Sequence, residues 1–468
     1  MSAKRHSAQS FDVKLLSMIH NITRIESMSR KTKMLPFFFL SLFLSTQAQE
    51  KLSLVELIEI GLEANPSVQI MQNNSEIARN NHSYAPFMPS LRASGRTNVS
   101  RTNEERVLAI ETGAEREFRN VRSENLGAGA SLSWRIFDGL GMFATFDRTG
   151  LQYSVSELQT RRVVENLVVN ISDQYYRIVV QEHRLEAARR LMELSRERFR
   201  IIQEQVNIGT ASGMDLQQAR LDFNADSSYL VRQEELLKNS YVRLNRLVNH
   251  DLSGSMYVTD TITLGTPLNH DDLELMAMEN NSSVLISLMG IEISEADIRL
   301  ARSGRFPNLD FVTGYTYNRS ESPAGIATFN QSHGFNYGFE ASMNIFNGFQ
   351  VDRNIKNARI LLKNQELTLE DTRLQVRSEM QILYNTYLNN LMMVDFEKQN
   401  VEVSRVNLDL ALERYELGVL SGLGFREFQF SYINAVDRSL DALYQSKLLE
   451  LSLLVLSGQM DEFLNRIQ

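Results

Sequence analysis

Hydrophobic and polar residues alternate with a period of two in several segments of the chain. From Phe335 to Ile345 every second residue is hydrophobic, and the residues between them are polar or glycine. Residues 126–136 and 309–317 follow the same pattern, and residues 91–99 follow it more weakly. The alternation predicts β-strands with one hydrophobic and one polar face. A half-buried sheet on a soluble core has the same period, but aromatic residues opposite glycine and small polar residues fit lipid-facing strands better.

Longer segments repeat a hydrophobic residue every seven positions. Residues 140–208 contain no proline, and a helix of this length would reach roughly 100 Å. Sevenfold spacing over several heptads predicts coiled-coil packing against neighbouring helices. The stripes are Val164, Ile171, Ile178, Leu185, Met192, Phe199 and Val206, then Leu216, Phe223, Leu230, Leu237 and Leu244, and later Met380, Tyr387, Val394, Val401, Leu408 and Tyr415. We expect the charged residues beside the first stripe to face solvent, namely Arg184, Glu186, Arg189, Arg190, Glu193, Arg196 and Glu197.

The chain contains two related halves. An offset of 209 takes Gly139 to Gly348 and Gly209 to Gly418, whereas Pro89 maps to a later proline at an offset of 218. The first half therefore carries extra residues upstream of Gly139, which we place in a charged loop from Asn103 to Glu124. Each half is predicted to contain a helix, two strands, a very long helix, a tight turn and a returning helix.

The N-terminal segment resembles an export signal. Arg30, Lys31 and Lys33 precede a short hydrophobic run that ends at small residues before Ala48. We expect the true start to be Met28, with cleavage after Ala48. The predicted organisation is an N-terminal extension and signal peptide at 1–48, repeat 1 at 49–250, a linker with some strand character at 251–268, and repeat 2 at 269–468.

Composition excludes several classes of function. The chain has no cysteine, and its formal net charge of −8 argues against nucleic-acid binding, which requires clustered Lys and Arg. No metal-ligand spacing, phosphate-binding loop or Ser/His/Asp signature is present in the sequence. We therefore expect no cofactor, no metal and no enzymatic activity.

The strand pattern also bears on the oligomeric state. No segment after the signal has 18 consecutive hydrophobic residues, so membrane insertion would require a β-barrel. Four strands cannot close a barrel, and open edges in lipid leave backbone groups unpaired at several kcal/mol each. Two chains would supply eight strands, and side chains fill the interior of an eight-stranded barrel. Three chains would supply twelve, with a lumen lined by the glycine, serine and asparagine positions.

Several local motifs, found in both halves, resemble the TolC-like outer-membrane efflux proteins. They lie at 57–66, at the strand starts 85–91 and 301–309, at the strand ends 136–139 and 345–348, and at the turns 209–213 and 418–422. The resemblance implies an α+β membrane protein that forms a homotrimer. It implies a trimeric 12-stranded β-barrel in the outer membrane, in contact with its lipid, and a long α-helical coiled-coil tunnel in the periplasm. It further implies a passive conduit that docks on a periplasmic adaptor of an inner-membrane pump, for efflux or type I secretion.

The turns are candidate docking sites. Gly209 and Gly418 follow long helices, where the next residue often needs a positive φ, and Ser212 and Ser421 are suited to cap the returning helices. These residues also simply reverse the chain, and both roles are compatible. The resemblance implies that the tips contact the adaptor through Gly209, Thr210, Ser212, Gly213, Gly418, Ser421 and Gly422.

The resemblance also identifies gate and junction positions. Asp215 and Tyr415 match the family's link between helices, in which a carboxylate accepts a hydrogen bond from a phenol. Where the family often has two acids one turn apart, this chain has Gly424 and Glu427, so one acidic ring of three Glu427 side chains is expected to favour cations. Glu427 has an equal claim to being a plain surface carboxylate. The expected barrel–helix junctions are Pro89, Phe137, Gly139, Pro307, Phe346 and Gly348.

Two other classes of function compete with the conduit. A trimeric, membrane-anchored coiled-coil structural protein or adhesin would have one long rod and one strand cluster, whereas this chain visits the strands twice. A periplasmic enzyme would need a polar constellation that the sequence does not contain. The sequence does not identify the cargo, the cognate pump or the resting state of the mouth.

Overall fold

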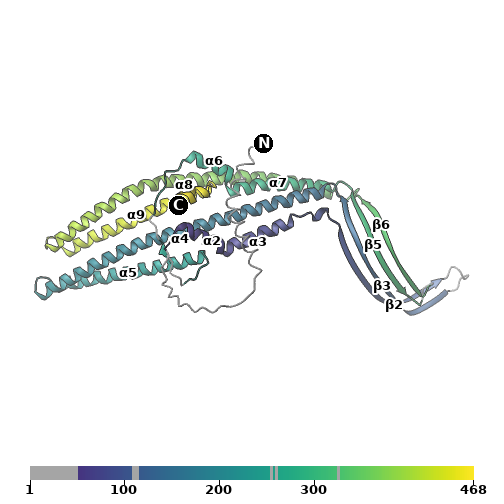
Figure 1. Ribbon diagram of the computed structural model, residues 1–468, viewed down its shortest axis with the longest axis horizontal. Coiled ribbons are helices and arrows are strands. Elements are labelled where there is room, and N and C mark those ends of the chain that lie inside the picture. Colours follow the sequence, from purple (N-terminus) through teal and green to yellow (C-terminus); the bar gives the residue numbers. More distant parts are fainter. Residues whose placement is uncertain (1–50, 108–114, 253–256, 259–261, 324–326, 468) are drawn as a thin grey trace, which may run out of the picture. The chain divides into compact units, whose positions relative to one another are not determined.

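The computed structural model describes residues 51–107, 115–252, 257–258, 262–323 and 327–467. All of them belong to one compact unit, residues 49–468. The predicted signal segment 1–48 lies outside the described residues. The first half contains β1 Lys51–Leu52, α2 Leu54–Ala64, α3 Pro66–Asn81, the 3-10 turn η1 Ala85–Phe87, β2 Ser90–Val107, β3 Glu115–Phe137, α4 Gly141–Asn207 and α5 Gly213–Leu247. The second contains β4 Tyr257–Val258, α6 His270–Asn280, α7 Ser282–Ser303, β5 Asn308–Glu321, β6 Phe329–Ser342, α8 Gln350–Glu416, α9 Gly422–Leu456 and α10 Met460–Ile467 (Figure 1).

The two predicted strand pairs form one antiparallel sheet in the order β2-β3-β5-β6. Its register places the hydrophobic positions of the four strands on one face, as in the row Leu91–Leu132–Thr313–Tyr337. The opposite face carries the glycine, serine and asparagine positions. β2 and β6 are the edges, and neither has a partner strand on its outer side among the described residues.

Two predictions about the strands were wrong. The segment from Asn103 to Glu124 is not a loop, because β2 continues to Val107 and β3 begins at Glu115. These ends pair with each other beyond the end of β5, through backbone hydrogen bonds that do not depend on a hydrophobic pattern. The second error concerns β6, which ends at Ser342 although the alternation continues to Ile345. The backbone pairing of β6 begins at Asn308 of β5, so the last hydrophobic residues lie beyond the ladder.

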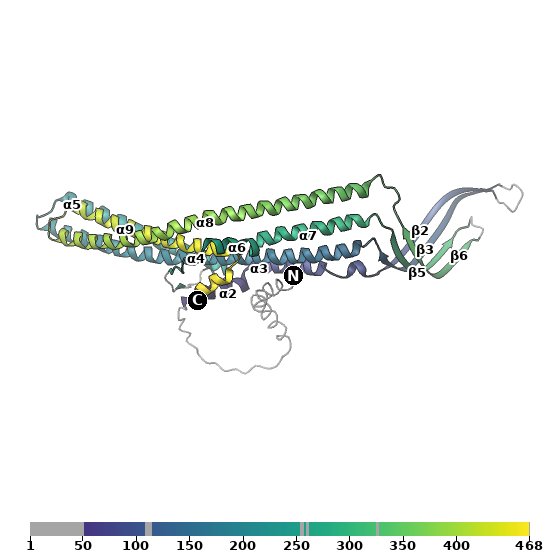
Figure 2. The ribbon, with the colours of Figure 1, turned by 90° about the horizontal axis from the view of Figure 1, so that it is seen from above.

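The long helices agree closely with prediction. α4 and α8 each have 67 residues, so each is roughly 100 Å long, and both return through 35-residue helices. Because α4 and α8 start near strand ends and finish at turns, the sheet and the turns lie at opposite ends of these helices (Figures 1 and 2). Most of the heptad stripe on α4 is buried, and six of the seven charged residues beside it are exposed. None of the described helices combines the length and the apolar composition needed to cross a membrane.

Strand and helix join through two consecutive left-handed residues in each half. Gly139 and Leu140 have φ of 70° and 69°, and Gly348 and Phe349 have φ of 62° and 61°. Leu140 and Phe349 hold a conformation that is costly for a residue with a Cβ atom. The side chain of the residue before each glycine caps the helix, since Asp138 accepts from the Met142 N–H and Asn347 from the Gln350 N–H, each at 3.1 Å.

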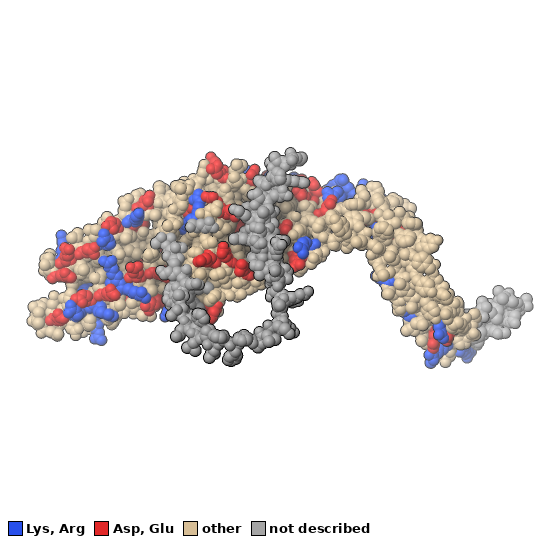
Figure 3. All heavy atoms as spheres, in the orientation of Figure 1, with Lys and Arg blue, Asp and Glu red and all other residues tan. Residues whose placement is uncertain are grey.

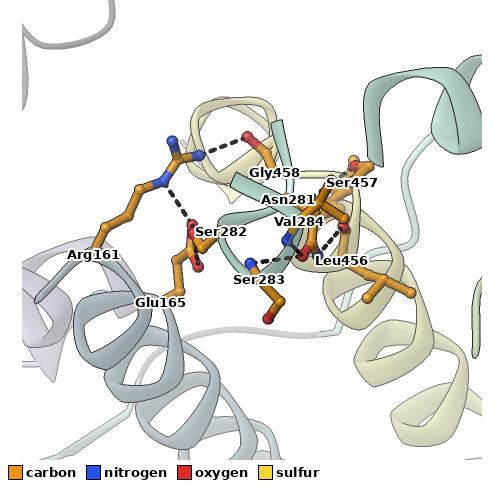
Figure 4. Close-up of polar contacts among 10 residues, drawn as sticks. Arg161, Glu165, Asn281, Ser282, Ser283, Val284, Leu456, Ser457 and Gly458 are labelled. Carbon is orange, nitrogen blue, oxygen red and sulfur yellow. Dashed lines mark hydrogen bonds and ion pairs between the residues drawn. The ribbon is translucent and has the colours of Figure 1, made fainter. Parts of the chain in front are cut away.

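A second pair of repeat-related contacts joins the short helices to the returning ones. The Asn65 side chain caps α3 by accepting from the Ser67 N–H at 2.9 Å, and it donates to the Leu247 carbonyl of α5 at 2.8 Å. Asn281 does the same for α7, accepting from Ser283 at 2.9 Å and donating to Leu456 of α9 at 2.8 Å (Figure 4). Each asparagine therefore fixes both a helix start and a helix end, which explains its presence in both halves.

The main hydrophobic core lies midway along the long helices, where α2, α6, α10 and the parallel pair β1–β4 surround them. The predicted linker thus supplies a strand that pairs with the start of repeat 1.

An ion cluster is buried beside this core. Glu450 accepts from Lys447 at 3.1 Å and from Arg466 of α10 at 2.9 Å, and both Lys447 and Glu450 are 1% exposed.

Replacing Gly139 by alanine is expected to destabilise the protein more than replacing Gly348. Both changes place a Cβ atom on a left-handed residue, which costs about 1–2 kcal/mol. At Gly139 the added Cβ would also lie 2.5 Å from the Ser303 carbonyl oxygen, whereas Gly348 has open space around it. Thermal unfolding of the two purified variants in detergent measures the difference. Equal losses would show that the Ser303 contact does not constrain the junction.

Replacing Glu450 by glutamine should leave the buried Lys447 charge without its counter-ion. We expect this change to lower the free energy of unfolding by about 3 kcal/mol. Glu462 offers a matched control, because it binds the same Arg466 but its side chain is 48% exposed. Glu462→Gln should cost less than about 1 kcal/mol. Denaturant titration of both variants makes the comparison, and a similar loss in each would contradict it.

Candidate functional site

The two turns at the ends of the helical hairpins have nearly the same conformation. Gly209 and Gly418 have φ of 80° and 72°, which agrees with the expected left-handed residue after each helix. Ser212 and Ser421 are the N-caps of α5 and α9, and their hydroxyls accept from the third following N–H, of Asp215 and Gly424 respectively. Both turns expose their backbone at the ends of the hairpins.

Asp215 completes a capping box in the first turn only. Its carboxylate accepts from the Ser212 N–H at 3.1 Å and from the Ser212 hydroxyl at 2.7 Å. These hydrogen bonds lower the pKa of Asp215, so the carboxylate is ionised near neutral pH. The second turn has Gly424 at the equivalent position and lacks the carboxylate. Asp215 therefore has a hydrogen-bond partner, Ser212, within its own turn.

The other two gate residues lie on the second hairpin. Tyr415 stacks on Phe425 with ring centroids 5.2 Å apart, and both belong to a small hydrophobic cluster near the turn. Within the described parts of one chain, no hydrogen bond joins Tyr415 to Asp215. Glu427 is exposed on α9. Its environment in one chain is that of a surface carboxylate, and its assignment to a gate stays a prediction.

A buried ion network, which we call the tip clasp, joins the two hairpins just behind the turns. Asp226 of α5 accepts two hydrogen bonds from Arg426 of α9, at 2.5 and 2.6 Å. Asp226 is 3% exposed and Arg426 is 7% exposed. Ser195 of α4 also donates to Asp226. The clasp is completed by Arg198, which donates to Asp222 at 2.7 Å.

Arg198 explains one of the small residues at the tips. A Cβ atom added to Gly422 would lie 2.6 Å from the Arg198 guanidinium, so this side chain of repeat 1 rests directly on the turn of repeat 2. Gly213, the equivalent glycine of repeat 1, has open space around it. A side chain at 422 would therefore have to displace the Arg198 guanidinium, whereas one at 213 would meet no neighbour within 4 Å.

A second polar link lies further from the turns. Arg184 donates to Asp437 at 3.1 Å and to Asp441 at 2.7 Å, both on α9. Burial raises the pKa of Asp437 even though Arg184 lowers it. The expectation that Arg184 faces solvent was therefore wrong. A position off the heptad stripe of α4 still contacts α9, because α4 packs against α9 as well as against α5.

The tip clasp was not among the features predicted from the sequence. Comparison of the two halves contained a signal for it, because the offset of 209 maps Asp226 to Ala435 and Gln217 to Arg426. The charged residues of the clasp are therefore positions at which the two halves differ.

In the view of Figure 3, charged side chains gather on the helical part and at the far end of the sheet, and the stretch between them is largely uncharged.

The junction positions lie where the strands meet the long helices. Pro89 and Pro307 directly precede β2 and β5, and Phe137 is the last residue of β3. Gly139 is buried against Ser303, whereas Gly348 and Phe346 are exposed. The two junctions thus share a backbone conformation and differ in packing.

Comparisons with known proteins agree with this architecture. Residues 57–250 and 275–459 match the family described as Outer membrane efflux protein. The chain is 22% identical over 237 residues to the outer membrane protein TolC of Vibrio cholerae, a match that covers 48% of this chain and 52% of that protein. The chain therefore spans about half the length of this curated relative.

Solved structures share the fold. The CmeC outer membrane channel of Campylobacter jejuni is similar with a TM-score of 0.73 and 15% identity, covering 93% of this chain and 97% of that one. The open state of the MtrE outer membrane channel of Neisseria gonorrhoeae gives a TM-score of 0.67 and 16% identity, covering 92% and 99%. The predicted fold class, with strands for a β-barrel and helices for a long tunnel, is confirmed. The family match spans both halves, so the chain belongs to the outer membrane efflux protein family, a family of trimeric outer-membrane channels of tripartite pumps.

Proposed function

We propose that three copies of this chain form a passive channel that carries cargo from a periplasmic adaptor and an inner-membrane pump to the outside of the cell. The observation that carries this proposal is the four-stranded sheet, which has one hydrophobic face and two edges that no other described strand pairs with. In lipid, the backbone groups of such edges have to be paired by further strands. Three sheets of four strands supply a barrel wide enough for a lumen.

The second long helix supports the same assembly. α8 has nine buried residues in one chain, compared with 23 in α4, although the two helices have equal length. Many of its large hydrophobic side chains are exposed, and such a stripe on a coiled-coil helix requires a neighbouring helix. The exposed residues are Ile360, Leu361, Leu367, Leu374, Ile382, Leu388, Met392, Met393, Phe396, Val403, Val406 and Leu410. In the proposed trimer, α8 packs against the adjacent chain.

The turns are suited to bind a helical partner end to end. Gly209, Gly213 and Gly418 present backbone without side chains, so another chain can approach closely. The tip clasp fixes the two turns of one chain relative to each other, and three chains would then present six turns in a ring. We assign this ring to the periplasmic adaptor, and Glu427 and Asp215 to the mouth within it.

The competing structural or adhesin role accounts for fewer features. A spacer needs a rod and an anchor, but it does not need a sheet with a continuous small and polar face. The duplicated order of helix, strand pair and helical hairpin supplies both a lumen wall and a tunnel wall in each half. Channels of this family conduct and carry out no catalysis, which is consistent with a chain whose repeated features are all structural.

Single-channel recording in planar bilayers tests the proposal. The purified mature protein should form ion-conducting channels, and Glu427→Gln should lower the preference for cations by about threefold because a ring of like charges focuses the field in a narrow pore. Glu413→Gln, on the same hairpin, serves as the charge-matched control. Protein that inserts but never conducts, even with both Glu427 and Asp215 replaced, would refute the channel.

The tip clasp should hold the turns in place. Asp226→Ala leaves the buried Arg426 guanidinium without its counter-ion, at a cost of about 3 kcal/mol, so amide hydrogens of residues 422–435 should exchange roughly a hundredfold faster. Glu204→Ala removes an exposed partner of Arg200 near the same turn and should change exchange little. Unaltered exchange in Asp226→Ala would mean that the clasp does not order the tips.

A further inference from the structure

The polar face of the sheet has an uneven distribution of charge. Five successive rows of paired residues cross the four strands on this face, from the row Ser90–Ser133–Val312–Gly338 to the row Asn98–Asn125–Ser320–Asn330. Glycine, serine, asparagine, threonine and one valine fill these rows, apart from two positions on β2. The two exceptions are Arg92, in the row with Ser131, Gly314 and Asn336, and Arg96, in the row with Gly127, Asn318 and Ser332.

Both arginines are exposed, and among the described residues neither makes an ion pair. The nearest acidic groups on this face are Asp310 and Glu340, which lie opposite each other at the helix end of the sheet. Asp310 already accepts from Arg135 at 3.0 Å. Along the strands, Asp310 is about 14 Å from the row of Arg92 and about 27 Å from that of Arg96. The acidic groups that the structure describes on this face therefore leave both arginines without compensation.

The energetics of the bilayer place these side chains in water. A lipid-facing arginine at the middle of a barrel strand costs about 2–4 kcal/mol. Arg92 and Arg96 lie a few residues inside the strand and on the face opposite the aromatic residues, so the same sheet that buries Tyr337 and Phe335 in lipid exposes both arginines to the lumen. Glycines occupy positions in the same rows, such as Gly127 and Gly314, and these positions add no side chain to the polar face.

We propose that Arg92 and Arg96 form a cationic exit filter, in which six guanidinium groups of the trimer line the lumen and select anionic cargo. This inference rests on the proposed trimeric channel and adds a substrate class to it. Like charges in a lumen with low-dielectric walls focus the field and concentrate counter-ions. Guanidinium groups also bind carboxylate and phosphate through paired hydrogen bonds. The cargo would therefore be organic anions that carry carboxylate, phosphate or sulfate groups.

The test is the reversal potential of single channels in a KCl gradient. The variant R92Q/R96Q should raise the ratio of potassium to chloride permeability by about threefold over the unmodified channel. R92K/R96K keeps the charge and should keep the ratio near its original value. R319Q is the matched control, since Arg319 lies on the opposite face of the same sheet, and it should leave the ratio unchanged.

The outcomes separate this inference from the channel proposal. If R92Q/R96Q conducts with the original ratio, the filter is refuted and the channel stands. If the unmodified protein never conducts, the channel fails and the filter fails with it. If R92Q/R96Q does not assemble, inorganic pyrophosphate added to the unmodified channel decides the question. It should reduce chloride current at low salt, and an absence of this reduction would overturn the filter.

Discussion

The unpaired backbone at the two edges of the sheet constrains the rest of the structure. A four-stranded sheet with one hydrophobic face is stable in lipid only when other strands pair with β2 and β6, and the chain itself contains no further long strand among its described residues. In the proposed trimer, strands paired between chains would also bring three sets of helical hairpins together in one ring. Their narrow heptad stripes then find partners that a single chain does not supply.

Duplication produced two halves with the same backbone plan and different roles. The asparagine caps, the left-handed junctions and the turns recur with little change, since each is fixed by local backbone requirements. The side-chain environment differs: α4 has 23 residues buried within one chain, whereas α8 has nine and leaves many large hydrophobic side chains exposed. The clasp residues Asp226 and Arg426 have no charged counterpart in the other half. The residues that recur in both halves account for the shared architecture. The clasp residues, which differ between the halves, lie where the halves contact each other.

The period of the sequence predicted strands and helices well because each depends on local pattern. The ends of elements were harder to predict. The end of β6 depends on where β5 stops pairing with it. The charged ends of β2 and β3 pair through their backbones alone, so the hydrophobic pattern did not reveal them as strands. The two turns were predicted correctly from Gly209 and Ser212 and their repeats. The clasp and the Arg184 link were missed because burial of a charge depends on which helix lies opposite it. The Asp215 and Tyr415 link stays a prediction, since no hydrogen bond joins these side chains in the described parts of one chain.

The two proposed charged rings lie at opposite ends of the molecule. Glu427 is close to the turns and Arg92 is in the sheet, so the whole length of α8, roughly 100 Å, separates them. This distance is many times the Debye length of about 8 Å at physiological ionic strength, so neither ring alters the field at the other. In the proposed channel, the acidic mouth and the basic exit would therefore act in series as independent filters. We expect the ring in the narrower passage to dominate the ion preference of the channel.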